Sequence, residues 1–277
     1  MKILVTGATG HLGIALVNKL IQKGIDKSNL ILMGHSEKRS DIVMRKFGLK
    51  VFVGDISDEV FLSNIFKSNE IDKIVHSAAI KYVSISNKNP IRTIETNVIG
   101  SYLIYKLAIK HGINDVVSIS TDKAINPSNI YGMTKALMEK MAIDFGFTVV
   151  SGVNFFGSSG SVLDVWYSQY KSGQNLTLTD PNCVRYFVTA DYVSDLILDS
   201  FGKNEVVFCN NVFKINMKNL LDAFLDFFDY ENFEITSLLE GEKITEQIPE
   251  SINVLETEEV ILKEMIRKWS EDNLNNY

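Results

Sequence analysis

Few features of this sequence point to a disulfide-stabilised, metal-binding or membrane-spanning protein. Its two cysteines, Cys183 and Cys209, are too few for a disulfide framework, and neither lies in a CxxC motif or in a Cys/His cluster with zinc spacing. We therefore expect two buried, reduced thiols and no metal site. No apolar run approaches the roughly 18 residues that a transmembrane helix requires, so no membrane partner is expected.

An excess of basic charge is also missing. The chain has 28 lysines and arginines against 34 aspartates and glutamates, a formal net charge of −6, and the two signs are interspersed. Because no basic patch would attract a polyanion, nucleic acid is not expected as a partner. The first apolar stretch, MKILVTG, is too short for the core of a secretory signal and runs directly into glycines, which favours a first strand and a cytoplasmic protein.

What the sequence does contain is a regular alternation of short β-rich runs and helix-length segments. With 277 residues, of which 45% are hydrophobic and 22% charged, the chain is long enough for one large α/β domain and a smaller appendage. We expect helices at about 90–111 and 131–144, and strands at 2–6, 29–34, 50–53, 71–76, 115–120 and 147–152. This βαβ alternation predicts a Rossmann-type, doubly wound parallel sheet over residues 1–150.

The pattern loosens after residue 150, where neither a proline- or glycine-rich linker nor an internal repeat occurs. Apolar spacing predicts helices at about 162–173 and 190–201. The acidic tail contains a further helix near 258–269, with charges of both signs, which we interpret as a solvated surface helix. We expect residues 151–277 to form a small C-terminal lobe that packs beside the carboxyl ends of the sheet rather than an independent domain.

Three glycines form a G-x-x-G-x-x-G motif between the first strand and the first helix. At such a turn the backbone bends tightly and approaches a pyrophosphate, while the amides of the helix N-terminus face the anion. A plain tight turn is the alternative, but the position inside a βαβ unit favours dinucleotide binding. The residues expected to contact the dinucleotide here are Gly7, Thr9, Gly10, His11, Leu12 and Gly13.

The end of the second strand bears on which dinucleotide binds. Many NAD enzymes carry an acidic residue there for the ribose 2′-hydroxyl, whereas this chain reads MGHSEKR. Ser36, Lys38 and Arg39 can instead receive a 2′-phosphate, so NADP is the expected cofactor and NAD the alternative. A solvated basic turn that binds nothing is the other interpretation of these residues.

Two further strand ends should contact the cofactor. Asp55, which follows the third strand, is placed to meet the adenine through its side chain or through the neighbouring amide of Ile56. Ala78 and Ala79, which follow the fourth strand, are small residues where the cofactor must pass close to the backbone.

A tyrosine and a lysine, Tyr131 and Lys135, are four residues apart and lie on one face of the helix expected at 131–144. They follow a strand that ends in Ser120-Thr121, so hydroxyl, phenol and ammonium can converge over a nicotinamide ring. To act as a base near neutrality, the phenol needs its ordinary pKa of about 10 to fall by about three units. Lys135 and an oxidised nicotinamide are the expected sources of that stabilisation. A surface tyrosine in an amphipathic helix is the alternative.

The stretch STDKAINPSNIYGMTK joins these motifs, and it closely resembles the extended short-chain dehydrogenases/reductases that act as UDP-N-acetylglucosamine 4,6-dehydratases in polysaccharide and pseudaminic acid pathways. The resemblance covers nearly the whole chain, through TGATGHLG, AAIKYV, NPIRTIETNVIGS, NFFGSSGSV, LTLTDPNCVRYFVT and EGEKITEQ. Within this resemblance the STDKA segment is specific, because related sugar epimerases lack its Asp-Lys pair. The resemblance implies that residues 1–150 bind NADP and that residues 151–277 bind a UDP-sugar substrate.

The resemblance also implies a cycle of oxidation at C4, loss of water across C5 and C6, and reduction at C6. The configuration at C5 is either retained or inverted. Tyr131 would accept the C4 hydroxyl proton, Lys123 would remove the C5 proton and Asp122 would protonate the departing C6 hydroxyl, with Thr121 and Lys135 beside them. An aspartate suits an acid only if its pKa rises, and a lysine suits a base only if its pKa falls. A surface pair that caps a loop is the alternative interpretation of Asp122 and Lys123.

For binding, the resemblance implies that Asn97 orients the cofactor site through backbone contacts and that Lys81 lies near the cofactor and the sugar or its phosphates. The remaining substrate contacts that it implies are Asn154, Ser161, Arg185 and Glu242.

Two positions depart from the family pattern. Ser151 and Ser159 stand where the family has arginines, in the region expected near the substrate. A nucleotide-sugar 4-epimerase or reductase of the same fold, and a non-catalytic NADP-binding protein, therefore remain alternatives to the dehydratase. Because such dehydratases commonly form dimers or larger rings, the resemblance implies a homo-oligomer.

Overall fold

The computed structural model describes residues 1–238 and 243–274. The chain forms two compact units, the first from Met1–Gly152 with Thr189–Cys209 and the second from Val153–Val188 with Asn210–Tyr277. This division differs from a single boundary at residue 150, because residues 189–209 return to the first unit. They supply helix α9 (Ala190–Leu198), which packs on α1 (His11–Gln22), and strand β10 (Val206–Phe208), which extends the large sheet.

The first unit contains a seven-stranded sheet in the order β10-β6-β5-β4-β1-β2-β3, and every neighbouring pair in it is parallel. The predicted Rossmann-type fold is therefore confirmed. The sequence predicts every strand of this sheet except β10. These predicted strands are β1 (Ile3–Thr6), β2 (Leu30–Gly34), β3 (Val51–Val53), β4 (Lys73–His76), β5 (Asp115–Thr121) and β6 (Thr148–Gly152).

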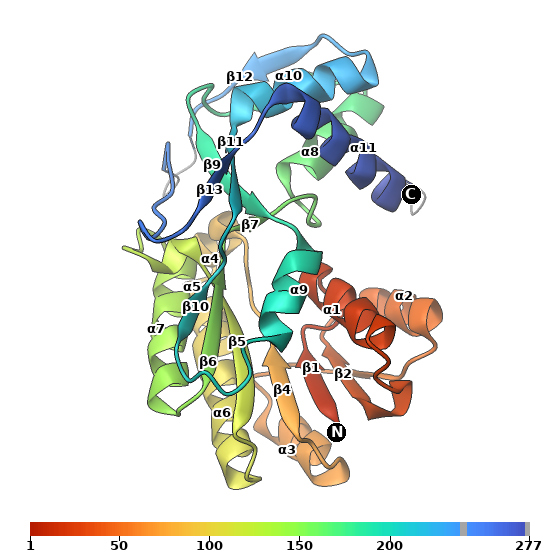
Figure 1. The fold of residues 1–277 in the computed structure, drawn as a ribbon, viewed down its shortest axis with the longest axis vertical. Coiled ribbons are helices and arrows are strands. Elements are labelled where there is room, and N and C mark those ends of the chain that lie inside the picture. The colour runs from red at the N-terminus through yellow and green to blue at the C-terminus, as the bar shows by residue number, and fades with distance from the viewer. Residues whose placement is uncertain (239–242, 275–277) are drawn as a thin grey trace. The chain divides into compact units, whose positions relative to one another are not determined.

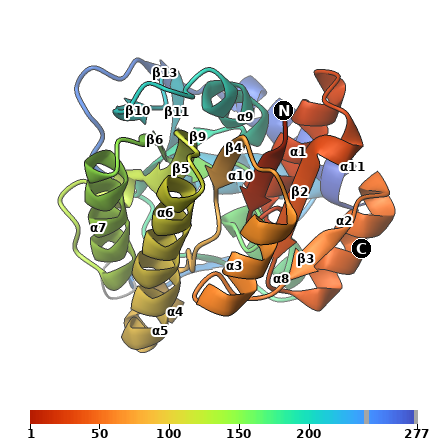
Figure 2. The ribbon, with the colours of Figure 1, turned by 90° about the horizontal axis from the view of Figure 1, so that it is seen from below.

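Helices cover both faces of this sheet (Figure 1, Figure 2). One face carries α1, α2 (Glu37–Phe47) and α9, and the other carries α3 (Glu59–Ser68), α6 (Gly100–Lys110) and α7 (Ile130–Asp144). The helix predicted at 90–111 has three parts, α5 (Pro90–Ile94), the π-helical turn η2 (Glu95–Ile99) and α6. The short elements of this unit are η1 (Lys27–Asn29), α4 (Val83–Lys88) and η3 (Asp122–Ala124).

Apolar side chains at alternate strand positions join the sheet to α3, α6 and α7. Leu4, Ile74, Val116 and Val149 come from four neighbouring strands and are each at most 1% exposed. Burying one such side chain contributes about 1.5–3 kcal/mol to folding, so this face of the sheet fixes the positions of the three helices.

Towards the carboxyl ends of the strands, the same face of the sheet becomes polar. Thr6 is paired in register with His76 on the neighbouring strand, and His76 with Ser118 on the next, and all three are buried. Because parallel strands end together at this edge, it is the edge where open α/β sheets bind their ligands.

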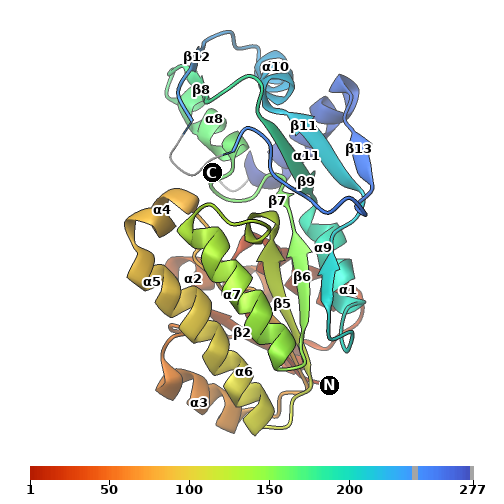
Figure 3. The ribbon, with the colours of Figure 1, turned by 90° about the vertical axis from the view of Figure 1, so that its left-hand side faces the viewer.

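The second unit has its own sheets and its own core. Three of its strands, β9, β11 and β13, run side by side (Figure 3), and β7 completes the sheet in the order β13-β11-β9-β7. A separate pair joins β8 to β12. The elements of this unit are β7 (Asn154–Phe155), α8 (Val162–Lys171), β8 (Leu176–Leu178), β9 (Val184–Val188), β11 (Val212–Asn216), α10 (Met217–Phe228), β12 (Phe233–Ile235), β13 (Val254–Glu256) and α11 (Glu259–Leu274).

Helix α11 differs from the solvated surface helix predicted near 258–269. Leu262, Ile266 and Trp269 are at most 4% exposed and belong to the core of the second unit, where α11 packs against α10. Their i, i+4, i+7 spacing puts them on one face, so the charges of both signs occupy only the remaining faces of the helix.

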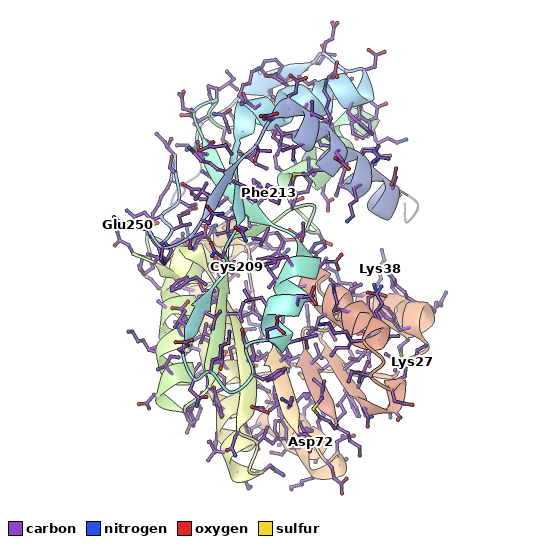
Figure 4. All side chains as sticks on the ribbon, viewed as in Figure 1. Lys27, Lys38, Asp72, Cys209, Phe213 and Glu250 are labelled. Carbon is purple, nitrogen blue, oxygen red and sulfur yellow. The ribbon has the colours of Figure 1, made fainter. Side chains whose placement is uncertain are left out.

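Cys183 and Cys209 are buried and neither is in a disulfide bond, as the sequence predicts; Figure 4 marks Cys209. Among residues 1–238 and 243–274, no helix is both long and apolar enough to cross a membrane. In the same part of the chain, no group of His, Cys, Asp and Glu side chains could hold a metal ion.

Candidate active site

The glycine turn between β1 and α1 brings three segments of backbone together. Gly7 has φ +70°, and a Cβ on it would lie 2.7 Å from the backbone nitrogen of Ala78. A Cβ on Gly13 would clash with the carbonyl oxygen of Gly7. Only glycine therefore fits at these two positions, as the tight turn of a dinucleotide-binding βαβ unit requires.

Helix α1 starts directly after this turn. Gly10 precedes its first residue and makes no side-chain cap, and the Gly10 nitrogen donates to the Gly7 carbonyl at 2.9 Å. The first amides of a helix have no intrahelical acceptor, so those of His11, Leu12 and Gly13 can donate to an anion. Thr9 takes a different role, because its side chain is buried against Gly34 at the end of β2.

The residues considered for a 2′-phosphate lie at the start of α2. Ser36 caps this helix, and its Oγ accepts from the backbone nitrogen of Arg39 at 3.4 Å. Lys38 and Arg39 are exposed in the first turn, where Figure 4 shows the side chain of Lys38 projecting from the surface. Ser36 thus has a structural role of its own, while the two cations are free to meet an anion from solvent.

Asp55 is already engaged with the protein. Its Oδ1 accepts from the nitrogen and the hydroxyl of Ser57 at 2.9 and 2.7 Å, and its Oδ2 pairs with the guanidinium of Arg92 on α5. Burial opposes the change, but these hydrogen bonds and the Arg92 charge lower the pKa of the Asp55 carboxyl. Ile56 is buried against Gly100, since a Cβ on Gly100 would lie 2.5 Å from Cγ1 of Ile56. The sequence analysis did not identify Arg92.

Asn97 of the π-helical turn holds the loop that follows β4. Its Oδ1 accepts from the nitrogen of Ile80 at 2.8 Å, and its Nδ2 donates to the Ile80 carbonyl at 3.0 Å and to Thr134 Oγ1 at 3.1 Å. The side chain is buried and its amide is fully used within the protein. Asn97 therefore orients this loop and the start of α7 rather than offering its amide to a cofactor. Its place in a π-helical turn is typical of functional sites.

The loop that Asn97 holds carries three of the candidate binding residues. Ala78 and Ala79 are partly buried, and Ala78 is the residue whose backbone Gly7 approaches. Lys81 is exposed, with its Nζ 5.1 Å from the centre of the Tyr82 ring.

His76, at the end of β4, joins the same site from inside the sheet. Its Nδ1 lies 2.8 Å from Thr6 Oγ1, and its Nε2 lies 2.9 Å from Ser101 Oγ. Ser101 donates its proton to the carbonyl of Asn97 at 2.7 Å, so it accepts from His76, which fixes the neutral tautomer with the proton on Nε2. Burial, reinforced by the charge of Lys135, lowers the pKa of His76 to about 3.

The start of α7 places the phenol and the ammonium against the end of β5. Asn129 caps the helix by accepting from the nitrogen of Gly132 at 2.9 Å. Tyr131 is hydrogen-bonded to the side chain of Thr121, and Lys135 donates from Nζ to the carbonyl of Ile119. Tyr131 and Lys135, one helical turn apart, thus bond to Thr121 and Ile119, which are two residues apart on β5.

The electrostatics of this pair differ from the expectation that Lys135 lowers the pKa of the phenol. Burial is the largest effect on Tyr131 and raises its pKa; the hydrogen bond with Thr121 opposes this, and the charge of Asp122 adds to it. Burial also lowers the pKa of Lys135 to about 8, opposed by Glu139 one turn further along α7. In the free protein, burial and the charge of Asp122 therefore both favour the protonated phenol.

Asp122 and Lys123 form an ion pair in η3, directly after β5, in which Asp122 is buried and Lys123 partly buried. Lys123 Nζ lies 3.1 Å from Asp122 Oδ1, with side-chain exposures of 17% and 1%. Thr121 Oγ1 donates to the same Oδ1 at 2.9 Å and accepts from the backbone nitrogen of Lys123 at 3.4 Å. Asp122 Oδ2 is buried and has no hydrogen-bond partner among the described residues. The surface pair considered from the sequence is therefore not what the fold produces.

Gly132 brings α7 close to this pair, a role that the sequence analysis did not identify. A Cβ on Gly132 would clash with the carbonyl oxygen of Lys123, so only glycine allows the helix to start here. The signal was present in the sequence, since a glycine directly after Tyr131 lies inside a helix, where glycine is unfavourable. The close approach itself is a tertiary contact.

The expected substrate residues lie in the second unit and are described there alone. Asn154 on β7 donates from Nδ2 to the carbonyl of Tyr186 at 3.0 Å. Arg185 on β9 donates from Nη1 to the carbonyls of Val184 and Ile244 at 3.0 and 2.9 Å. Both side chains therefore support the backbone of this unit.

Ser161 precedes the first residue of α8, and its Oγ is buried without a hydrogen-bond partner in the described part of the chain. The loop before it passes beneath the C-terminal helix, because a Cβ on Gly157 would lie 2.5 Å from Trp269 Cδ1. Ser151, where the family has an arginine, is buried at the end of β6 in the first unit. Glu242 lies outside the described residues.

Comparison with known proteins supports the resemblance. A family model described as polysaccharide biosynthesis protein matches residues 3–267. A UDP-glucose 4-epimerase from Rickettsia conorii is 30% identical over 266 residues, which are 90% of this chain and 77% of that protein. The crystal structure of Pen from Bacillus thuringiensis is 26% identical with a TM-score of 0.80, covering 88% of this chain and 79% of that one.

A more distant structure shows the fold alone. DesIV, a dTDP-glucose 4,6-dehydratase from Streptomyces venezuelae solved with NAD bound, is 20% identical with a TM-score of 0.83 and covers 100% of this chain and 99% of its own. The family match over almost the whole chain, the parallel sheet with its glycine turn, and the Tyr131 and Lys135 pair agree with one another. The chain belongs to the polysaccharide biosynthesis protein family of extended short-chain dehydrogenases/reductases.

Proposed function

We propose that this protein is a nucleotide-sugar 4,6-dehydratase that acts on a UDP-N-acetylhexosamine, with UDP-N-acetylglucosamine as the first candidate and NADP as cofactor. The pair of the buried Asp122 and the partly buried Lys123, next to Tyr131, carries the proposal. Oxidation and reduction at C4 need one base and a dinucleotide, whereas elimination of water needs an acid and a second base. Asp122 and Lys123 supply these two groups within one turn of chain.

The glycine turn fits a dinucleotide. Any side chain on Gly7 would clash with the backbone of Ala78, and the α1 amides are available to a pyrophosphate. When bound, the nicotinamide supplies the reversible two-electron oxidation of the sugar at C4. Lys38 and Arg39, exposed at the start of α2, support NADP, and NAD is the alternative because DesIV holds NAD.

Each proton transfer then falls to one side chain. Tyr131 takes the proton of the C4 hydroxyl as C4 becomes a ketone. The ketone acidifies C5, whose proton Lys123 removes in its neutral form. Asp122 gives a proton to the C6 hydroxyl, which leaves as water, and Oδ2, the atom without a protein partner, is available for this contact. Lys123 returns its proton to C5 as C6 is reduced, which gives the 4-keto-6-deoxy sugar.

On the substrate side, we assign the nucleotide diphosphate to the second unit. Asn154, Ser161 and Arg185 come from β7, the start of α8 and β9. The buried Ser161 hydroxyl without a partner supports a ligand there, and arginine is suited to phosphate. The first unit would bind the cofactor and this unit the UDP-sugar.

A 4-epimerase is the second candidate, and one observation favours it. The curated relatives that match this chain include UDP-glucose 4-epimerases at about 30% identity. An epimerase returns the hydride and the proton to C4, so its product has the mass of its substrate. Incubation with NADP and UDP-N-acetylglucosamine without a reductant separates the two candidates: the dehydratase gives a product lighter by one water, and the epimerase gives an isomer.

We further propose that the protein is a homo-oligomer that pairs through α5, α6 and α7. Neighbouring helices of this layer expose large apolar side chains that a monomer would leave in water. A second copy of the same surface covers them with a symmetric contact. These side chains are Ile91, Ile94, Ile99, Tyr102, Ile109, Met133, Leu137 and Ile143.

A further inference from the structure

Three side chains of the candidate site form one directed chain of hydrogen bonds. Thr121 Oγ1 donates its only proton to Asp122 Oδ1 at 2.9 Å. Its lone pairs accept from the backbone nitrogen of Lys123 at 3.4 Å and from the hydroxyl of Tyr131, with which Thr121 is hydrogen-bonded. The chain therefore runs from the phenol, through the threonine hydroxyl, to the carboxylate.

At the end of each cycle of the proposed reaction, Tyr131 has one proton too many and Asp122 has one too few. Tyr131 gains one proton when the C4 hydroxyl becomes a ketone. Asp122 loses one proton when the C6 hydroxyl leaves as water. Lys123 gains the C5 proton and returns it, so it ends unchanged. A second cycle cannot begin until the proton on the phenol has left and the carboxylate has regained one.

We propose that Thr121 is a proton relay that resets the site between cycles by carrying the proton of Tyr131 to Asp122. In this step the O–H bond of Tyr131 breaks as a new O–H bond forms on Thr121 Oγ1. At the same time the original O–H bond of Thr121 breaks, and its proton bonds to Asp122 Oδ1. Thr121 ends as a neutral hydroxyl, the phenol becomes the phenolate base, and the carboxylate becomes the acid. No electron pair leaves these oxygens, so the step needs no further reactant.

Burial makes this internal route necessary. Thr121 is 6% exposed and the Asp122 side chain 1%, so neither exchanges protons readily with bulk water. Lys123 Nζ also lies 3.1 Å from Asp122 Oδ1 and helps to hold the carboxyl group in place. In each cycle the proton taken from the C4 hydroxyl replaces the one that leaves with the water, so solvent is needed only to charge the site once.

This inference rests on the proposed dehydratase, because a 4-epimerase returns the proton from the phenol to the C4 oxygen and needs no reset. The two candidates therefore predict different behaviour when the relay is cut. Thr121→Val keeps the shape of the side chain and removes the hydroxyl, and Thr121→Ser keeps the hydroxyl. Thr148→Val is a matched control, since Thr148 is also buried, in the neighbouring strand β6, and its Oγ1 accepts from the backbone nitrogen of Asn204 at 3.0 Å, outside the site.

The test compares single and repeated turnover of UDP-N-acetylglucosamine by the full chain, saturated with NADP and equilibrated at the working pH. With protein in excess, one cycle needs no reset, so we expect Thr121→Val to slow product formation much less than it lowers kcat. With substrate in excess, we expect its kcat to fall by about 10²-fold or more, as for loss of an acid–base group, while Thr121→Ser and Thr148→Val stay close to wild type.

Equal loss in both regimes would show that Thr121 acts in the chemical step alone, and no loss in either would show that the hydroxyl is dispensable. Each result overturns the relay while the dehydratase stands. Wild-type protein that releases no dehydrated sugar overturns the proposed function, and the relay with it, before any variant is measured.

Discussion

The ammonium of Lys123 lies 3.1 Å from one oxygen of the Asp122 carboxylate, whereas the other oxygen is buried with no hydrogen-bond partner among the described residues. A buried polar atom without a hydrogen-bond partner lowers the stability of the fold by about 1–3 kcal/mol. Stability alone therefore gives no reason to retain such an atom. We propose that this atom, next to Thr121 and Tyr131, contacts the substrate, and that the pair of Asp122 and Lys123 eliminates water from a sugar.

The phenol of Tyr131 should titrate differently with and without cofactor. Burial raises its pKa in the free protein, so it should stay protonated to above pH 10, the ordinary value for tyrosine. An oxidised nicotinamide places a positive charge beside it and should move its ionisation to lower pH. Ultraviolet difference titration of wild type against Tyr131→Phe measures this. An ionisation that does not move when oxidised cofactor is added would contradict the role of Tyr131 as base.

Acid should destabilise the protein through His76. Its pKa is about 3 in the folded protein and 6.5 when unperturbed, so below pH 6.5 the unfolded chain binds a proton that the folded protein does not. Stability should therefore fall as pH drops from about 6.5 to 3, with a contribution of up to about 1.4 kcal/mol per pH unit. Urea unfolding at several pH values measures the slope.

His76→Gln should flatten this slope, although it lowers stability at pH 7, because it keeps a donor for Ser101 but loses the acceptor for Thr6. His111→Gln is the control, because His111 is exposed and directly follows α6. This variant should leave the slope unchanged. A slope in His76→Gln as steep as in wild type would mean that other groups cause the acid sensitivity.

Gly132→Ala should damage the site although alanine favours helices. The helix propensity of alanine contributes about 1 kcal/mol in favour of the variant, but the new Cβ would clash with the Lys123 carbonyl, which is backbone and moves only with η3. We expect a lower Tm and slower dehydration, measured by thermal unfolding and by product formation. A variant that is both more stable and fully active would show that the close approach has no function.

The apolar side chains of α5, α6 and α7 should hold two copies together. Leu137→Glu places a charge among them and should shift the protein to a smaller species in sedimentation velocity. Ile42→Glu is a control of equal exposure, since both residues are 51% exposed but Ile42 lies on α2, on the other face of the sheet. Wild type that sediments as a monomer at every concentration would refute the contact.

Local sequence signals predicted most of the first unit. Strand runs such as 2–6 and 115–120, and the glycine turn, depend on residues close together in the chain, and the structure has these strands at nearly the predicted bounds. The placement of Tyr131 and Lys135 on one helix face also follows from spacing alone. Strand β10 did not, because its three residues are defined by pairing with β6 rather than by a pattern of their own.

What the sequence could not provide depends on distant contacts. The raised pKa of Tyr131 arises from burial, which the nearby Lys135 could not reveal. The ion pair of Asp55 with Arg92 joins the end of β3 to α5, and no local pattern connects them. The face of α11 is a different case, since the apolar spacing that ends at Trp269 was present in the sequence and was outweighed by the charges around it.

The most direct measurement is the mass of the sugar nucleotide after incubation with NADP, for wild type, Asp122→Asn and Lys123→Ala, with folding of each variant verified by circular dichroism. Wild type should convert UDP-N-acetylglucosamine to a product lighter by one water. In both variants the rate of dehydration should fall by about 10²-fold or more, while oxidation of the sugar at C4 should still reduce the bound cofactor. A wild-type product of unchanged mass, or variants that release water at the wild-type rate, would contradict the assignment of Asp122 and Lys123 as the acid and base.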